Sequence, residues 1–200
     1  MFPVGGVGVM LLGAALALVP CGLLALLARR RYGPVGSFAL GGLVWSLVVI
    51  GLVTLLPADG APGIVAAEGR LTTCGEIGGP APDGFWIFDG GQRLLNTVLF
   101  VPAGALLLVA ALSRPAWSLL TVPVGLAALA AYSGAIEWTQ LELARLDRAC
   151  DLTDVVDNVS GALIGALVGL GVGLVLRPWR RTPSGRPGGA RPRAGSGATH

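Results

Sequence analysis

Long, uninterrupted stretches of apolar residues dominate this sequence. Five such stretches are separated by polar segments, and each approaches or reaches the ~20 residues that a helix needs to cross a bilayer. Because apolar residues are continuous and do not alternate with polar ones, helices are favoured over the strands of a membrane barrel. The predicted membrane spans cover residues 7–28, 37–56, 94–112, 117–136 and 155–176.

The composition supports the same class of protein. Hydrophobic residues make up 54% of the chain and charged residues only 12%, about half the roughly 25% usual in soluble domains. We therefore expect an all-α fold, a polytopic integral membrane helical bundle with about five transmembrane helices. The one histidine is His200, which argues against Ser–His or Cys–His catalysis and His-ligated zinc.

The distribution of charge predicts the orientation in the membrane. The first apolar stretch is followed by three arginines and not preceded by them, unlike a signal peptide, so we expect a retained helix with its N-terminus outside. This orientation places most of the arginines inside and all 11 acidic residues outside, as expected from the excess of positive charge in cytoplasmic loops. The net charge of +3 is thus no sign of a nucleic-acid partner.

The chain divides into three predicted regions. Residues 1–91 hold two membrane helices and an outer loop, and residues 92–176 form a core with three membrane helices. Residues 177–200 are rich in arginine, proline and glycine without apolar periodicity, which is typical of a disordered tail, here cytoplasmic.

Glycines recur at every fourth position of the last predicted span, at Gly161, Gly165, Gly169 and Gly173. Glycines with this spacing share one helical face and allow another helix to approach closely. The chain has 32 glycines, so general abundance is the alternative explanation. The partner of such a face is either another helix of this chain or a second copy of it.

The three cysteines fall into two groups. Cys21 lies within the first span, where a buried thiol is expected. Cys74 and Cys150 both fall in predicted outer segments, where disulfides can form. We predict a Cys74–Cys150 disulfide that ties the two outer segments together, against the alternative of two unrelated thiols.

Polar residues around the end of the fourth span and the start of the fifth are the candidate chemistry. Their spacing of three or four residues would place them in a stripe on a helix, and ionisable groups near a bilayer are costly enough to suggest a functional site. Asn96, at the start of the third span, would lie at a comparable depth. The candidate ligand-binding residues are Asn96, Glu137, Gln140, Arg148, Asp151, Asp154 and Asn158.

Three segments that carry these residues have a recognisable pattern. They read NTVLFVPAG at 96–104, IEWTQ at 136–140 and RACDLTDVVDNVSGALIG at 148–165. Together they resemble the VanZ-like family, over roughly residues 92–169. That family is named for an accessory protein of glycopeptide-resistance gene clusters that is associated with teicoplanin resistance. The resemblance implies a multi-pass protein of the bacterial plasma membrane with a role in the cell envelope.

Three hypotheses for the polar residues follow. In a binding site, Arg148 would hold an anionic group of a lipid-linked envelope precursor or a lipid headgroup, with hydrogen bonds from Gln140, Asn96 and Asn158. In an enzyme, Glu137 or Asp154 would act as general base, and paired carboxylates could hold a divalent cation. The chain shows no nucleophile motif, so we lean against catalysis and assign no cofactor and no metal ligands.

The third hypothesis is a non-catalytic scaffold. Asp151 would then cap the last helix, with a second acid three residues later. Arg148 and Glu137 would form an ion pair between the fourth and fifth helices, and Asn96 would cap the third.

Overall fold

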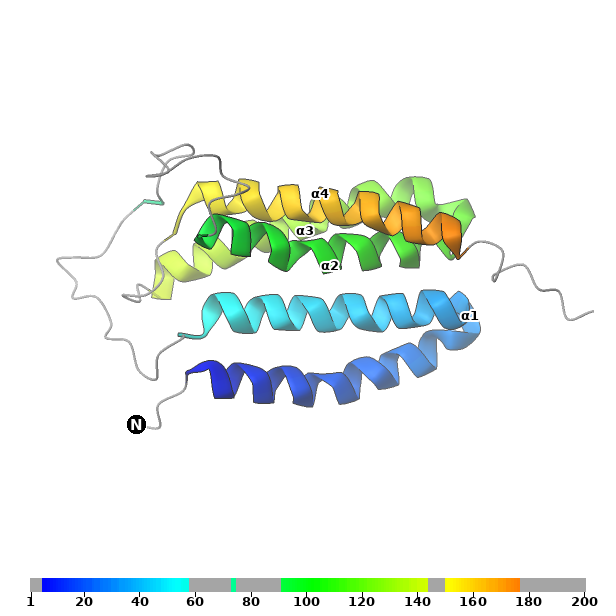
Figure 1. Cartoon of the computed structure of the whole chain (residues 1–200), viewed down its shortest axis with the longest axis horizontal. Helices are drawn as coiled ribbons and strands as arrows, with labels where there is room; N and C mark the ends of the chain where they lie inside the picture. Colours follow the sequence, from blue (N-terminus) through cyan, green and yellow to red (C-terminus); the bar gives the residue numbers. More distant parts are fainter. Residues whose placement is uncertain (1–4, 58–72, 75–90, 144–149, 177–200) are drawn as a thin grey trace, which may run out of the picture.

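The computed structural model describes residues 5–57, 73–74, 91–143 and 150–176. These residues form helices and no strands, so the protein is an all-α membrane bundle. Each helix is long and apolar enough to cross a membrane. The helices are α1 (Val7–Leu55), α2 (Gln92–Leu112), α3 (Pro115–Leu143) and α4 (Leu152–Val175) (Figure 1).

The expected number of helices is corrected from five to four, because the first two predicted spans belong to one element, α1. A straight helix of its 49 residues would be about 74 Å long, more than twice the ~30 Å of the hydrocarbon core. Instead α1 bends at Gly33, whose φ of 70° and ψ of 176° suit glycine almost exclusively. The two arms of α1 lie side by side in Figure 1.

Contacts along α1 hold its two arms together. The indole Nε1 of Trp45 donates a hydrogen bond of 2.8 Å to the carbonyl oxygen of Ala14 on the other arm. At the open end, the backbone N–H of Gly6 donates to the carbonyl of Pro57 at 2.8 Å. Each arm can therefore cross the bilayer separately, although the two arms form one element, α1, joined at Gly33.

Helices α2 and α4 make the closest contact in the bundle. A Cβ atom added at Gly161 would overlap the carbonyl of Thr97, and one at Gly165 would overlap that of Val101. From the opposite side, a Cβ atom at Gly104 would overlap the carbonyl of Ala162. The predicted glycine packing face is thus confirmed, and its partner is α2 of the same chain.

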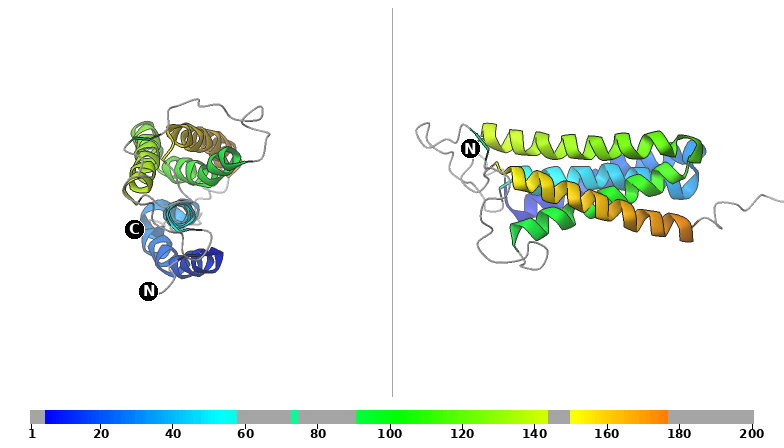
Figure 2. Two further views of the ribbon diagram at one scale, coloured as in Figure 1. Left: turned by 90° about the vertical axis from the view of Figure 1, so that its left-hand side faces the viewer. Right: turned by 90° about the horizontal axis from the view of Figure 1, so that it is seen from above.

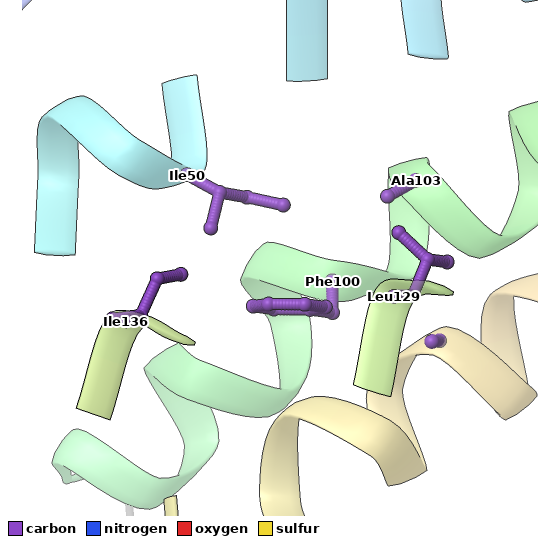
Figure 3. Close-up of a cluster of buried hydrophobic side chains, with 6 residues drawn as sticks. Ile50, Phe100, Ala103, Leu129 and Ile136 are labelled. Atoms are coloured by element: carbon purple, nitrogen blue, oxygen red, sulfur yellow. The ribbon is translucent and has the colours of Figure 1, made fainter. Parts of the chain in front are cut away.

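A small apolar core lies where the four helices meet. Ile50 of α1, Phe100 and Ala103 of α2, and Leu129 and Ile136 of α3 are buried against one another (Figure 3). On α3 the core residues Leu129 and Ile136 flank the buried Ser133, so the core adjoins the polar residues described below.

The bundle has two ends of opposite charge. The first end holds both termini of α1, the start of α2, the end of α3 and the start of α4, and the second holds the bend of α1 (Figures 1 and 2). We call the first the acidic end, since it carries Glu137, Asp151 and Asp157, and the second the basic end, since it carries Arg31 and Arg114. That the acidic end faces outside remains a prediction, and the predicted tail at 177–200 lies outside the described residues.

Candidate polar site at the acidic end

Polar side chains from three helices, all of them buried except the partly exposed Arg93, gather at the acidic end. Helix α3 continues to Leu143, further than the predicted 136, so Glu137 and Gln140 lie inside it. We call the gathered side chains the polar layer. It consists of Arg93 and Asn96 from α2, Ser133, Glu137 and Gln140 from α3, and Asp154, Asp157 and Asn158 from α4.

An ion pair joins α2 to α4 in this layer. The Nε atom of Arg93 lies 2.9 Å from Oδ2 of Asp157, and its Nη2 atom donates to Oδ1 at 3.2 Å. The Asp157 side chain is 2% exposed and that of Arg93 is 30% exposed. Such two-point pairing is strong and directional, so it sets the relative rotation of the two helices.

Sequence reasoning missed both members of this pair as site residues. Arg93 precedes Asn96 by three positions, so both share a face of α2, and Asp157 directly precedes Asn158. The spacing to Asn96 was a usable signal, but nothing in the sequence couples two residues that lie 64 positions apart.

Two asparagines contribute to the polar layer, Asn96 from α2 and Asn158 from α4. Asn158 is 2% exposed, and its Nδ2 atom donates to Oγ of Ser133 at 2.9 Å. Its Oδ1 atom, and the Nδ2 atom of Asn96, are buried without a hydrogen-bond partner in the described part of the chain. Leaving a buried donor or acceptor unpaired costs about 1–3 kcal/mol each, so these two atoms are the most unusual feature of the layer.

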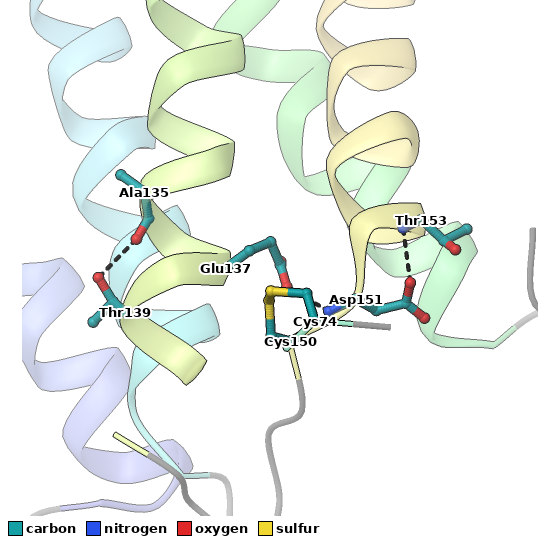
Figure 4. Close-up of a disulfide and its surroundings, with 7 residues drawn as sticks. All are labelled: Cys74, Ala135, Glu137, Thr139, Cys150, Asp151 and Thr153. Carbon is teal, nitrogen blue, oxygen red and sulfur yellow. Dashed lines mark hydrogen bonds between the residues drawn. A yellow bond between two sulfur atoms is a disulfide. The ribbon is translucent and has the colours of Figure 1, made fainter. Parts of the chain in front are cut away.

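Glu137 is buried beside the start of α4. Its side chain accepts a hydrogen bond of 3.0 Å from the backbone N–H of Asp151. Asp151 in turn accepts from the backbone N–H of Thr153 at 2.8 Å, which confirms the predicted N-cap. Figure 4 shows these contacts together with the predicted disulfide between Cys74 and Cys150, which is present. The disulfide therefore anchors the segment whose backbone Glu137 contacts.

Other predicted contacts differ from the structure. Gln140 was predicted to donate a hydrogen bond to a ligand. In the structure its Nε2 atom donates to the backbone carbonyl of Thr54 on α1 at 3.1 Å. Asn96 does not cap α2, because the helix begins at Gln92 and Gly91 is its N-cap. Asp151 precedes α4 as its N-cap, whereas Asp154 and Asn158 lie inside that helix, so the predicted polar stripe is not carried by one continuous helix. Arg148, including its proposed pair with Glu137, lies outside the described residues.

Charge and geometry limit what this layer can do. Among the described residues, no three side chains of histidine, cysteine, aspartate or glutamate are arranged to hold a metal ion. Glu137, Asp154 and Asp157 are all buried, and the cation Arg93 forms its ion pair with Asp157. The layer is therefore a negatively biased, hydrogen-bonding environment inside an apolar bundle.

These features define an integral membrane protein with a polar layer buried at one end of its helical bundle. The family model described as VanZ/LLP1 matches residues 43–174, and the chain belongs to this family. The match starts in the second arm of α1, well before the resemblance expected from residue 92 onward. No curated protein and no solved structure matches the chain.

Proposed function

We propose that this VanZ-family protein acts in the bacterial cell envelope, where it modulates susceptibility to glycopeptides such as teicoplanin. It would do so by binding a lipid-linked envelope component that carries an anionic group, at the outer leaflet. The observation that supports this proposal is the pair of unpartnered atoms, Nδ2 of Asn96 and Oδ1 of Asn158, inside the polar layer.

The two atoms are complementary to a polar ligand. Nδ2 of Asn96 is a donor and Oδ1 of Asn158 is an acceptor, so a ligand that offers an acceptor to the first and a donor to the second would satisfy both. Asn96 lies about one turn from the start of α2 at Gln92, and therefore close to the end of the bundle. Each hydrogen bond gained would recover part of the desolvation cost of these two unpaired atoms.

The charges indicate how such a ligand would be oriented. Glu137, Asp154 and Asp157 would repel an anionic group from the interior of the layer, whereas they accept hydrogen bonds from hydroxyl and amide groups. The anionic group would therefore stay at the rim, where Arg148 is the proposed cation. In this arrangement Glu137, Gln140, Asp151 and Asp154 contact the neutral polar part of the ligand.

The sharpest test replaces Asn96 by leucine, which has the same branching and the same number of side-chain heavy atoms but no polar atoms. If Asn96 is only a packing residue, removing an unpaired buried donor should be neutral or stabilising, and function should persist. If it binds ligand, teicoplanin tolerance should fall while the protein stays folded. The readout is the teicoplanin susceptibility of a strain that lacks the protein and is complemented with each variant.

Two controls keep this test interpretable. Thr139→Val removes a polar group from the same end of the bundle, where its hydroxyl donates only to the carbonyl of Ala135 at 2.7 Å (Figure 4), and should change nothing. Membrane abundance and thermal stability are measured for every variant. Wild-type tolerance in the Asn96→Leu, Glu137→Gln and Arg148→Ala strains at normal abundance would overturn the proposal.

A scaffold is the second candidate, favoured by the interhelical bonds of the layer. Arg93 with Asp157, Asn158 with Ser133, and Gln140 with the Thr54 carbonyl each join two different helices. A scaffold predicts that function follows stability in every variant. A binding site predicts that Asn96→Leu separates the two.

A further inference from the structure

A cavity opens at the basic end of the bundle, opposite the polar layer. Its volume is about 340 Å³, and it is bounded by α1, α2 and α3. Leu40 and Leu43 of α1 and Leu107 and Ala111 of α2 form apolar walls. The volume is within the range of about 300–1,000 Å³ that is usual for ligand pockets.

The cavity is polarised along the bundle axis. Arg31, Tyr32 and Arg114 line it at the bundle end, whereas Leu43 lies about 14 Å along the second arm of α1 from Pro34, the first residue after the bend. A molecule that fills it would therefore place a charged group at the basic end and an apolar chain toward the middle of the membrane. This division matches a phospholipid and does not match a fully water-soluble ligand.

The two cations at the mouth are available to an anion. In the part of the chain that the structure describes, neither Arg31 nor Arg114 forms an ion pair with a carboxylate. The acidic side chains of the helices all lie near the opposite end. The guanidinium of Arg114 stacks on the ring of Tyr32, with its Cζ atom 5.4 Å from the ring centroid. This contact helps to hold the cation in place.

We infer that this cavity binds one anionic glycerophospholipid. Its phosphate would lie between Arg31 and Arg114, and part of an acyl chain would lie against Leu40, Leu43 and Leu107. Basic pockets between membrane helices are suited to anionic lipid headgroups, and arginine is the better residue for phosphate because of its planar, multiple donors. The site is independent of the polar layer, since it lies at the other end of the bundle.

Native mass spectrometry of the full chain in a non-ionic detergent tests the inference. The probes are phosphatidylglycerol and phosphatidylcholine with identical acyl chains, and glycerol phosphate as the headgroup without a chain. We expect one phosphatidylglycerol to be retained in preference to phosphatidylcholine, and glycerol phosphate not to bind. Each arginine should contribute about fivefold to this preference, from the usual strength of one basic residue near an anionic lipid.

Different variants test the recognition of the lipid headgroup and the accommodation of the acyl chain. Arg31→Gln/Arg114→Gln should remove the preference, whereas Arg29→Gln, from the same run of arginines but outside the cavity lining, should keep it. Leu40→Trp should fill the cavity and weaken retention of both lipids. Equal retention of the two lipids by wild type, or an unchanged preference in the double variant, would overturn the inference. So would unchanged retention in Leu40→Trp, or an equal loss in Arg29→Gln.

Discussion

Replacing Gly161 by alanine should force helices α2 and α4 apart. The added Cβ atom would overlap the backbone carbonyl of Thr97, closer than the 3.0 Å that real Cβ atoms essentially never pass. A flexible side chain could move aside, but a helical backbone cannot. The substitution therefore tests whether the glycine face holds the bundle together.

The size of the effect follows from the displacement. The helices must separate by on the order of 1 Å, and such a gap forfeits a quarter to a half of the dispersion energy of the contacts that it opens. Overpacking of this kind costs about 1–3 kcal/mol, and the better helix propensity of alanine returns up to about 1 kcal/mol. We expect Gly161→Ala to lower the free energy of unfolding by up to about 2 kcal/mol, and by about 1–3 kcal/mol relative to a glycine-to-alanine change that makes no overlap.

The matched control is Gly171→Ala on the same helix. Gly171 is exposed, and a Cβ atom there would meet nothing within 4 Å, so only the propensity gain applies. Both variants are unfolded by titrating dodecyl sulfate into mild-detergent micelles, with helix content followed by circular dichroism. If Gly161→Ala is as stable as Gly171→Ala, the close contact between α2 and α4 does not stabilise the bundle.

Four further predictions follow from single features of the structure. Cys74→Ser should abolish the change in gel mobility on reduction and lower the free energy of unfolding by about 2–4 kcal/mol; a freely labelled Cys74 thiol in unreduced wild type would contradict the disulfide. Arg93→Gln should cost about 2 kcal/mol, less than for a fully buried pair because Arg93 is partly exposed, and adding Asp157→Asn should recover most of the loss. Simple additivity in that double variant would show that the two side chains are not coupled. Gly33→Ala should cost about 1–3 kcal/mol by backbone strain alone, measured by the same titration, and wild-type stability would argue against the bend. A cysteine introduced at Ser184 should react with an impermeant reagent only after cells are permeabilised; labelling in intact cells would reverse the orientation.

The membrane class and the helical content could be read from the sequence. An apolar run of about 20 residues must satisfy its backbone hydrogen bonds internally in lipid, so it is helical whatever surrounds it. The Asp151 cap is equally local, because it joins atoms two residues apart. The Cys74–Cys150 bond was predictable because both cysteines fall in segments expected on the outer side of the membrane, where disulfides can form.

The number of helices was not predictable in the same way. Gly33 and Pro34 favour a break, and the sequence predicts a connection between two separate spans there. In the structure, helical geometry continues up to and directly after the bend at Gly33. How sharply a helix bends depends on one backbone conformation and on the contacts between its arms, such as that of Trp45 with Ala14.

The sequence by itself determined which segments enter the membrane and which face of α4 is small enough for close packing. Only the tertiary structure decided that α2 occupies this face, that Arg93 pairs with Asp157, and that Arg31 and Arg114 share one cavity. The transfer of apolar residues into lipid and local hydrogen bonding depend on residues that are close together in the sequence, and so can be predicted from it. The partner of a buried side chain depends instead on the order and rotation of neighbouring helices, which arise only when the bundle packs.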